Sequence, residues 1–65
     1  MKVIKYIRLK NKWTQEYVAN LIGITKASYS NIETGKRNPS LSIALKIQNI
    51  FNESIEILLQ DNGEP

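Results

Sequence analysis

The fold is decided by residues 14–35, which read TQEYVANLIGITKASYSNIETG. Thr14 is a favourable N-cap for a helix over 15–22, because its hydroxyl can accept a hydrogen bond from the first helical turn. Gly23 follows at once, as expected for a residue that ends a helix with positive φ. After a turn of about three residues, a second helix is predicted over 26–34.

The second predicted helix has the features needed to cross closely over the first. Thr25 can cap its start, and Gly35 stops it. Ala19 in the first helix is small enough for close approach, while Tyr29 and Ile32, three residues apart, face back toward the core. Two short helices joined by a glycine-containing turn form the helix-turn-helix pattern.

The rest of the chain adds three further helical segments. Apolar residues at helical spacing predict helices over 2–10, 41–51 and 55–59, and no segment alternates with period two for long enough to form a strand. The sequence therefore predicts one compact all-α domain over 1–59. Residues 60–65 are polar and lack an anchor, so we expect them to fray.

Charge is distributed unevenly along the 65 residues. Residues 1–46 carry all nine basic residues and two acidic ones, a formal charge of +7, whereas residues 47–65 carry four acidic residues and no basic one. A basic body with an acidic end favours a polyanionic partner for the first part, although an ordinary solvated surface is also compatible with it.

Composition excludes or disfavours several classes of protein. The chain has no cysteine and no histidine, which rules out disulfides, zinc sites of the Cys/His type and a histidine base. The carboxylates are scattered and no glycine-rich phosphate loop is present, so we expect no enzyme and no bound metal, cofactor or small-molecule ligand. No apolar run can span a membrane and no signal peptide is visible, so the cytoplasm is the expected compartment.

One side of the helix predicted over 26–34 suits a DNA groove. At about 100° per residue, this side carries four short or basic residues, Lys26, Ala27, Ser30 and Asn31. A helix that enters the major groove needs a face without acidic groups, which phosphate repels, and without bulky apolar groups, which would lack a partner. The predicted outer face carries neither kind.

Three motifs carry a resemblance to a known family: QEYVA at 15–19, GIT at 23–25 and IETGKRNPS at 32–40. With them, about residues 3–59 resemble the Cro/repressor-type helix-turn-helix family, also called the xenobiotic-response-element type, in one register. The resemblance implies a five-helix, lambda-repressor-like fold. It also implies a small transcriptional regulator that binds double-stranded DNA, and it favours a repressor of a bacterium, phage or mobile element.

The resemblance implies that the third helix lies in the major groove. The expected base readers are Lys26, Ala27, Ser30 and Asn31. Lysine can donate to guanine, asparagine can pair with adenine, and the alanine methyl can contact the thymine methyl. Simpler interpretations stay open: Lys26 as a phosphate contact, Ala27 as a residue that only leaves room, and Asn31 as a solvent-facing polar group.

Phosphate contacts are implied for a second set of residues, Gln15, Thr25, Tyr29, Lys36, Arg37 and Asn38. Such contacts set register and give salt-dependent affinity, not sequence choice. Gln15 starts a helix whose free N–H groups attract phosphate, but it can also be an ordinary first residue. Thr25 can serve only as a cap, Tyr29 can be both core and phosphate donor, and the loop over 36–38 can be simply solvated.

Four residues receive structural or modifying roles from the resemblance. Arg8 and Glu33 match an ion pair that ties the first helix to the end of the third. Trp13 takes an apolar position of the family and is expected in the core. Lys12 stands where a glycine is frequent, which adds positive charge near the DNA side.

The apolar residues near the end of the chain suggest a homodimer. Four apolar residues lie on one short helix and cannot all face inward. We expect these four to form the dimer interface: Ile55, Ile57, Leu58 and Leu59. A dimer would match a two-fold operator. The alternative is that they cover the base of the core in a monomer. Leu41 and Leu45, by contrast, are expected to supply core contacts.

The alternative function is a protein-interaction module, such as an antitoxin or an adaptor with the same fold. The outer face of the third helix discriminates between the two functions, since DNA readers keep it polar and free of acidic residues. Residues 26–31 meet that condition, and this favours DNA binding.

Overall fold

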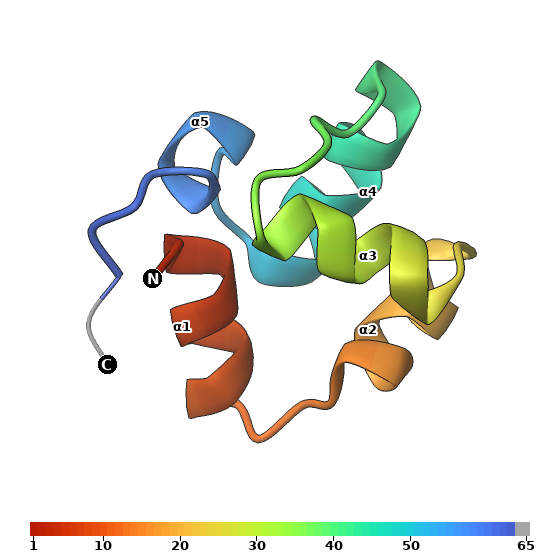
Figure 1. The fold of residues 1–65 in the computed structure, drawn as a ribbon, viewed down its shortest axis with the longest axis horizontal. Helices are drawn as coiled ribbons and strands as arrows, with labels where there is room; N and C mark the ends of the chain where they lie inside the picture. Colours follow the sequence, from red (N-terminus) through yellow and green to blue (C-terminus); the bar gives the residue numbers. More distant parts are fainter. Residues whose placement is uncertain (64–65) are drawn as a thin grey trace.

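Five α-helices follow one another in the computed structural model, which describes residues 1–63 (Figure 1). They are α1 (Val3–Lys10), α2 (Gln15–Ile22), α3 (Lys26–Glu33), α4 (Leu41–Phe51) and α5 (Ile55–Leu58). The described residues contain no strand, and none of their helices has the length and apolarity needed to cross a bilayer. The predicted all-α fold with five helices is confirmed.

Four of the helices begin at a hydroxyl that caps them. Thr14 and Thr25 each accept a hydrogen bond of 3.0 Å from the backbone N–H three residues on, at the starts of α2 and α3. Ser40 and Ser54 cap α4 and α5 in the same way, at 3.4 and 3.3 Å. Each cap satisfies an N–H that a helix start leaves without a partner, and stabilises the fold by about 1 kcal/mol.

Residues in the left-handed region end α2 and α4. Gly23 has a φ of 89°, and its N–H bonds the carbonyl of Ala19 at 2.8 Å, as the sequence predicts. Asn52 ends α4 with a φ of 54°, a conformation that asparagine tolerates better than most residues. Because both turns are tight, α3 and α5 each start within a few residues of the preceding helix.

The core lies between all five helices. Its largest fully buried side chains are Tyr29, Ile4, Ile22, Ile47, Leu58 and Val18. α2 packs against α3 and α4, whereas α5 contacts both α1 and α4. Trp13, in the loop after α1, packs edge-on against Phe51 with ring centroids 5.7 Å apart, so it joins the core as predicted.

Two residues of α4 lie outside this core. Leu41 and Leu45 are predicted to supply core contacts, but they are 77% and 51% exposed. The buried stripe of α4 runs through Ala44, Ile47 and Phe51. The prediction is wrong at these two positions, because helical spacing marks an apolar side of a helix without showing which edge of it meets a neighbour.

The end of the described chain is bound to its beginning. The N–H of Val3 bonds the Gln60 carbonyl at 2.8 Å, and the N–H of Gly63 bonds the Met1 carbonyl at 2.9 Å. The expectation that this end lacks an anchor is therefore wrong for residues 60–63, whereas its fraying stays a prediction, and the last two residues lie outside the described chain. The partner of this segment is the other end of the chain, which a local sequence pattern does not reveal.

Candidate nucleic-acid interface

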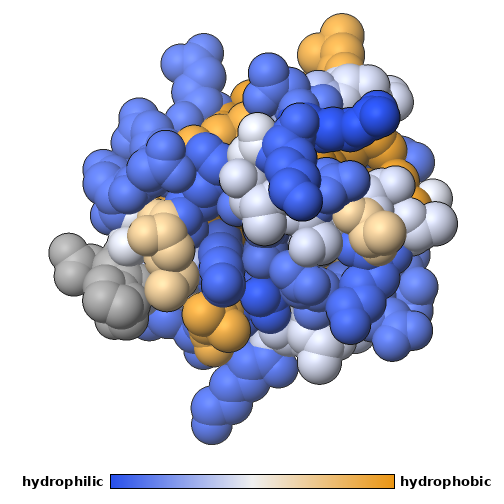
Figure 2. Space-filling view, viewed as in Figure 1, coloured by the Kyte–Doolittle hydropathy of each residue, from blue (hydrophilic) through white to orange (hydrophobic). Residues whose placement is uncertain are grey.

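α3 has one buried side and one open side. Tyr29 is buried beneath it, whereas Lys26 and Ala27 are exposed and Ser30 and Asn31 are half-buried at its open side. Figure 2 shows mostly hydrophilic blue and white surface over the place that α3 occupies in Figure 1. A helix with short side chains on its outer side fits a groove about 12 Å wide.

The turn before α3 sets the angle at which this helix leaves α2. The N–H groups of Gly23 and Ile24 both bond the carbonyl of Ala19, at 2.8 and 3.0 Å. The Thr25 hydroxyl accepts from the N–H of Ser28 and donates to its hydroxyl at 2.9 Å. Thr25 is exposed and acts as a cap, and its contact with phosphate stays a prediction.

The basic loop after α3 is held against the end of that helix. The Asn31 carbonyl accepts hydrogen bonds from the Arg37 N–H at 3.2 Å and from the Thr34 hydroxyl at 3.3 Å. Gly35 has a φ of 81° and turns the chain back. Residues 36–38 are all exposed, so the loop presents two cations and an amide next to the open side of α3.

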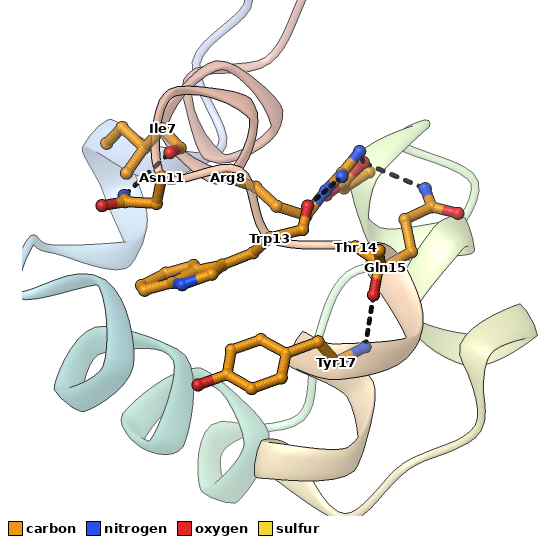
Figure 3. Close-up of polar contacts among 8 residues, drawn as sticks. Ile7, Arg8, Asn11, Trp13, Thr14, Gln15 and Tyr17 are labelled. Carbon is orange, nitrogen blue, oxygen red and sulfur yellow. Dashed lines mark hydrogen bonds and ion pairs between the residues drawn. The ribbon is translucent and has the colours of Figure 1, made fainter.

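A buried ion pair joins α1 to α3. Arg8 Nε lies 2.6 Å from Glu33 Oε2, and Arg8 Nη2 lies 3.2 Å from Oε1. Arg8 Nη1 donates to the carbonyl of Trp13 at 2.8 Å, and Figure 3 shows the Arg8 side chain extending from α1 toward Gln15 at the start of α2. The amide nitrogen of Gln15 donates to Glu33 Oε1 at 3.0 Å. One carboxylate thus connects α1, α2 and α3.

The surroundings of this pair keep both groups charged. Burial by itself raises the pKa of the Glu33 carboxyl, but hydrogen bonds from Arg8 and Gln15 outweigh it and hold the pKa below its ordinary value. The hydrogen bond to Glu33 raises the pKa of the Arg8 guanidinium. Because the two opposite charges are in contact, Glu33 adds little repulsion toward an approaching phosphate.

Comparison with known proteins identifies the family. A family model described as Helix-turn-helix matches residues 4–58. The chain belongs to the helix-turn-helix family. The resemblance inferred from the sequence is therefore confirmed, with α2 and α3 as the two helices of the motif.

Relatives of this helix-turn-helix chain come from archaea and bacteria. It is 43% identical over 62 residues to an uncharacterized HTH-type transcriptional regulator of Archaeoglobus fulgidus, which covers 94% of the chain and 87% of that protein. It is 36% identical over 53 residues to the HTH-type transcriptional regulator AnsR of Bacillus subtilis, 82% of the chain and 46% of AnsR. It is also 36% identical over 62 residues to the antitoxin HipB of Escherichia coli O6:H1, 95% of the chain and 66% of HipB.

Within this helix-turn-helix domain, Tyr29 lies too deep to touch DNA. Its side chain is fully buried, and its hydroxyl has no hydrogen-bond partner within residues 1–63. Burial, and then the neighbouring Glu33 carboxylate, raise the pKa of the Tyr29 phenol, so it stays neutral. The prediction of a phosphate contact is wrong for this residue, because its ring fills the core beneath α3.

The helix-turn-helix domain brings a further cation, Lys12, close to Lys26 of α3, in agreement with the expectation that it adds positive charge near the DNA side. Lys12 lines an open groove together with Gln15 and Lys26. Its φ of 60° lies in the left-handed region, which costs a lysine about 1 kcal/mol or more relative to glycine. The signal in the sequence is the lysine itself, at a position where the family often has glycine.

The predicted dimer residues of the helix-turn-helix domain do not share one environment. Leu58 is fully buried in the core, so its assignment to a dimer interface is wrong. Ile55 and Leu59 are half-buried and pack against the core. Ile57 is 41% exposed and is the member of the four that a partner would reach first. α5 is only one turn long, so when one side of it packs against the core, one apolar residue points outward.

Proposed function

We propose that the chain is a transcriptional regulator that binds double-stranded DNA by placing α3 in the major groove. One observation carries the proposal. The second helix of its helix-turn-helix has an open side of short, polar or basic residues, and the exposed basic loop over 36–38 follows directly. Helix-turn-helix proteins use this second helix to contact base edges. The names of the archaeal relative and of AnsR support a role in transcription.

The four residues on the open side of α3 are the proposed base readers. Lys26 donates to guanine O6 and N7, and Asn31 pairs with adenine N6 and N7. Ala27 contacts a thymine methyl, and Ser30 lies beside them with a hydroxyl that donates or accepts. Each well-formed bidentate contact discriminates against a wrong base by about 1–3 kcal/mol.

Phosphate contacts are proposed for the residues that flank α3. They are Gln15, Thr25, Lys36, Arg37 and Asn38. The acidic end of the chain, which holds Glu53, Glu56 and Asp61, would be repelled by the duplex and is proposed to lie away from it.

We further propose that the protein works in the cytoplasm, without a cofactor and without a catalytic activity.

A homodimer on a two-fold operator is the proposed binding form, since one short recognition helix gives limited specificity. Ile57 on α5 is the exposed apolar residue that we propose at the interface. Substitution Ile57→Asp is expected to leave the helical content unchanged and to abolish dimers in sedimentation. A variant that keeps the wild-type monomer–dimer equilibrium would exclude this interface.

Selection of binding sites from random DNA, followed by gel-shift titration, tests the function. We expect an enriched half-site, and loss of its discrimination at one position in Asn31→Ala. Affinity should fall with salt at a log–log slope of about −0.9 per neutralised phosphate. Lys46→Gln, a charge change outside the proposed interface, is the matched control and should leave the slope unchanged. Failure to enrich any sequence would contradict the proposal.

A protein-interaction function is the second candidate, because of the likeness to the antitoxin HipB. The exposed apolar residues Leu41 and Leu45 favour it as well, since they are available to a partner. Paired substitutions separate the two functions. Lys26→Ala with Asn31→Ala should destroy binding to the selected DNA, whereas Leu41→Ser with Leu45→Ser should leave it intact if DNA binding is the main activity.

A further inference from the structure

The side chain of Gln15 is held in one orientation by Glu33. The Gln15 amide nitrogen lies 3.0 Å from Glu33 Oε1. A carboxylate only accepts hydrogen bonds, so the NH2 group of the amide, and not its carbonyl oxygen, must face Glu33. One N–H of Gln15 is thereby used, and the second N–H remains to donate to another acceptor. The side chain is half-buried and lines the same open groove as Lys12 and Lys26.

Glu33 is itself held in place, because Arg8 donates a hydrogen bond to each of its oxygens. The side chains of Arg8 and Glu33 are 8% and 1% exposed, and the guanidinium contacts Oε2 at 2.6 Å and Oε1 at 3.2 Å. A third bond from Arg8 to the Trp13 carbonyl fixes the guanidinium to the loop before α2. The amide of Gln15 is therefore the outermost member of a buried, hydrogen-bonded series (Figure 3).

We propose that Glu33, held by Arg8, is a positioning residue for DNA binding: it presents the second amide N–H of Gln15 to a DNA phosphate. The proposal rests on the proposed function, since it concerns the same interface. It assigns to a buried acidic residue a favourable effect on binding a polyanion. Coulomb interaction alone predicts the opposite sign, because removing a negative charge near phosphate should tighten binding.

A double-mutant cycle tests the proposal without changing net charge. Arg8→Met with Glu33→Leu removes one positive and one negative charge, and replacing a buried ion pair by apolar residues of similar volume is often neutral or stabilising. Gln15→Ala is then introduced into the wild-type chain and into this background. Lys2→Met with Asp61→Asn is the matched control, because it removes the exposed ion pair that lies 3.1 Å apart between the chain ends.

The expected results are differences in affinity for the DNA selected from random sequence. Gln15→Ala should weaken binding about tenfold in the wild-type chain. This loss lies near the lower end of the range for the free energy of a hydrogen bond to a charged group. It should weaken binding less than about threefold in the Arg8→Met/Glu33→Leu background, and about tenfold again in the control background. Equal losses in all three backgrounds would show that the buried pair only supports the fold, and would overturn the proposal.

A measurement on the wild-type chain covers the case in which the double variant does not fold. The two side-chain amide protons of Gln15 are followed by NMR while the selected DNA is added. We expect one proton to shift strongly and the other, held by Glu33, to stay. Equal shifts of both protons, or of neither, would overturn the proposal, whereas a wild-type chain that binds no selected DNA would contradict the proposed function instead.

Discussion

The two ends of α1 are tied to the rest of the molecule by ion pairs of the same chemistry in different surroundings. Near its C-terminal end, Arg8 and Glu33 lie 2.6 Å apart, and both side chains are almost completely buried. Near its N-terminal end, Lys2 and Asp61 lie 3.1 Å apart, and the Asp61 side chain is 80% exposed. Water screens the second pair and is excluded from the first.

This difference decides what each pair can contribute. The exposed pair gains little, because solvent already stabilises the Asp61 carboxylate and Lys2 Nζ also donates to the Leu59 carbonyl at 2.9 Å. Its segment is also held by backbone hydrogen bonds between the chain ends. The buried pair is costly to break, because either partner alone would be an uncompensated charge in the core. The buried pair also orients Gln15, so it links the stability of the fold to the proposed interface.

The largest expected effect is the loss of one partner of the buried pair. Glu33→Ala leaves Arg8 charged and unpaired in the core, and should lower the free energy of unfolding by about 3–5 kcal/mol. A domain of this length has a total stability of only about 5 kcal/mol, so the variant should retain about 0–2 kcal/mol and be close to its unfolding midpoint at 25 °C. Urea titration followed by circular dichroism measures the loss. A decrease below about 1 kcal/mol would contradict it.

The second expected effect is acid destabilisation through the same carboxylate. The pKa of Glu33 is lower in the folded chain than its ordinary value of 4.5, so the folded state binds fewer protons than the unfolded state in this range. Its contribution is therefore complete above about pH 4.5 and is lost as pH falls through the lowered folded pKa. Unfolding titrations from pH 7 to pH 2 should show this loss in the wild-type chain.

The Arg8→Met/Glu33→Leu variant is the control for the acid titration. It has no carboxylate at this position, so it should lose less stability over the same pH range. Parallel pH curves for this variant and the wild-type chain would show that other carboxylates cause the acid sensitivity.

A smaller effect, of opposite sign, is expected just beyond the C-terminal end of α1. Lys12→Gly removes a side chain from a residue with a φ of 60°, and should raise the free energy of unfolding by about 1 kcal/mol. Asn52→Gly, at the other non-glycine residue with positive φ among those described, is the control and should gain less. A lower free energy of unfolding in Lys12→Gly would contradict the conclusion that the backbone at Lys12 is strained.

The smallest effect is expected at the exposed pair. Asp61→Asn should change the free energy of unfolding by less than about 0.5 kcal/mol, because the Asp61 carboxylate is exposed to solvent. The same urea titration measures it, and salt should reduce the difference further. A loss comparable to that of Glu33→Ala would show that burial does not explain the contrast between the two ends of α1.

Local features of the fold could be predicted from the sequence because neighbouring residues determine them. A hydroxyl can cap the helix that starts beside it, as Thr14 and Thr25 do. Gly23 takes up the positive φ that a tight helix end requires. The open side of α3 follows from helical periodicity, since Tyr29 and Ile32 identify the side that is buried.

Wrong predictions arose where the answer depended on a distant segment. Leu58 and the exposed Leu41 are equally apolar in sequence, but Leu58 lies on α5, which contacts α1 and α4, and it is fully buried. The sequence predicts Tyr29 as both a core residue and a phosphate donor, but the core encloses its side chain completely. Residues 60–63 are polar, yet the beginning of the chain supplies their hydrogen-bond partners.

The order of the helices, their caps and the polar side of α3 can be predicted from the sequence, because each depends on contacts within a few residues. The folded structure was needed to show which apolar residues are buried, and that Gln15 joins the Arg8–Glu33 pair that the family resemblance implies. These three residues are separated by up to 25 positions along the chain, and no local pattern encodes a hydrogen bond over that distance. The crossing of α1, α2 and α3 brings them together and sets the orientation of the Gln15 amide.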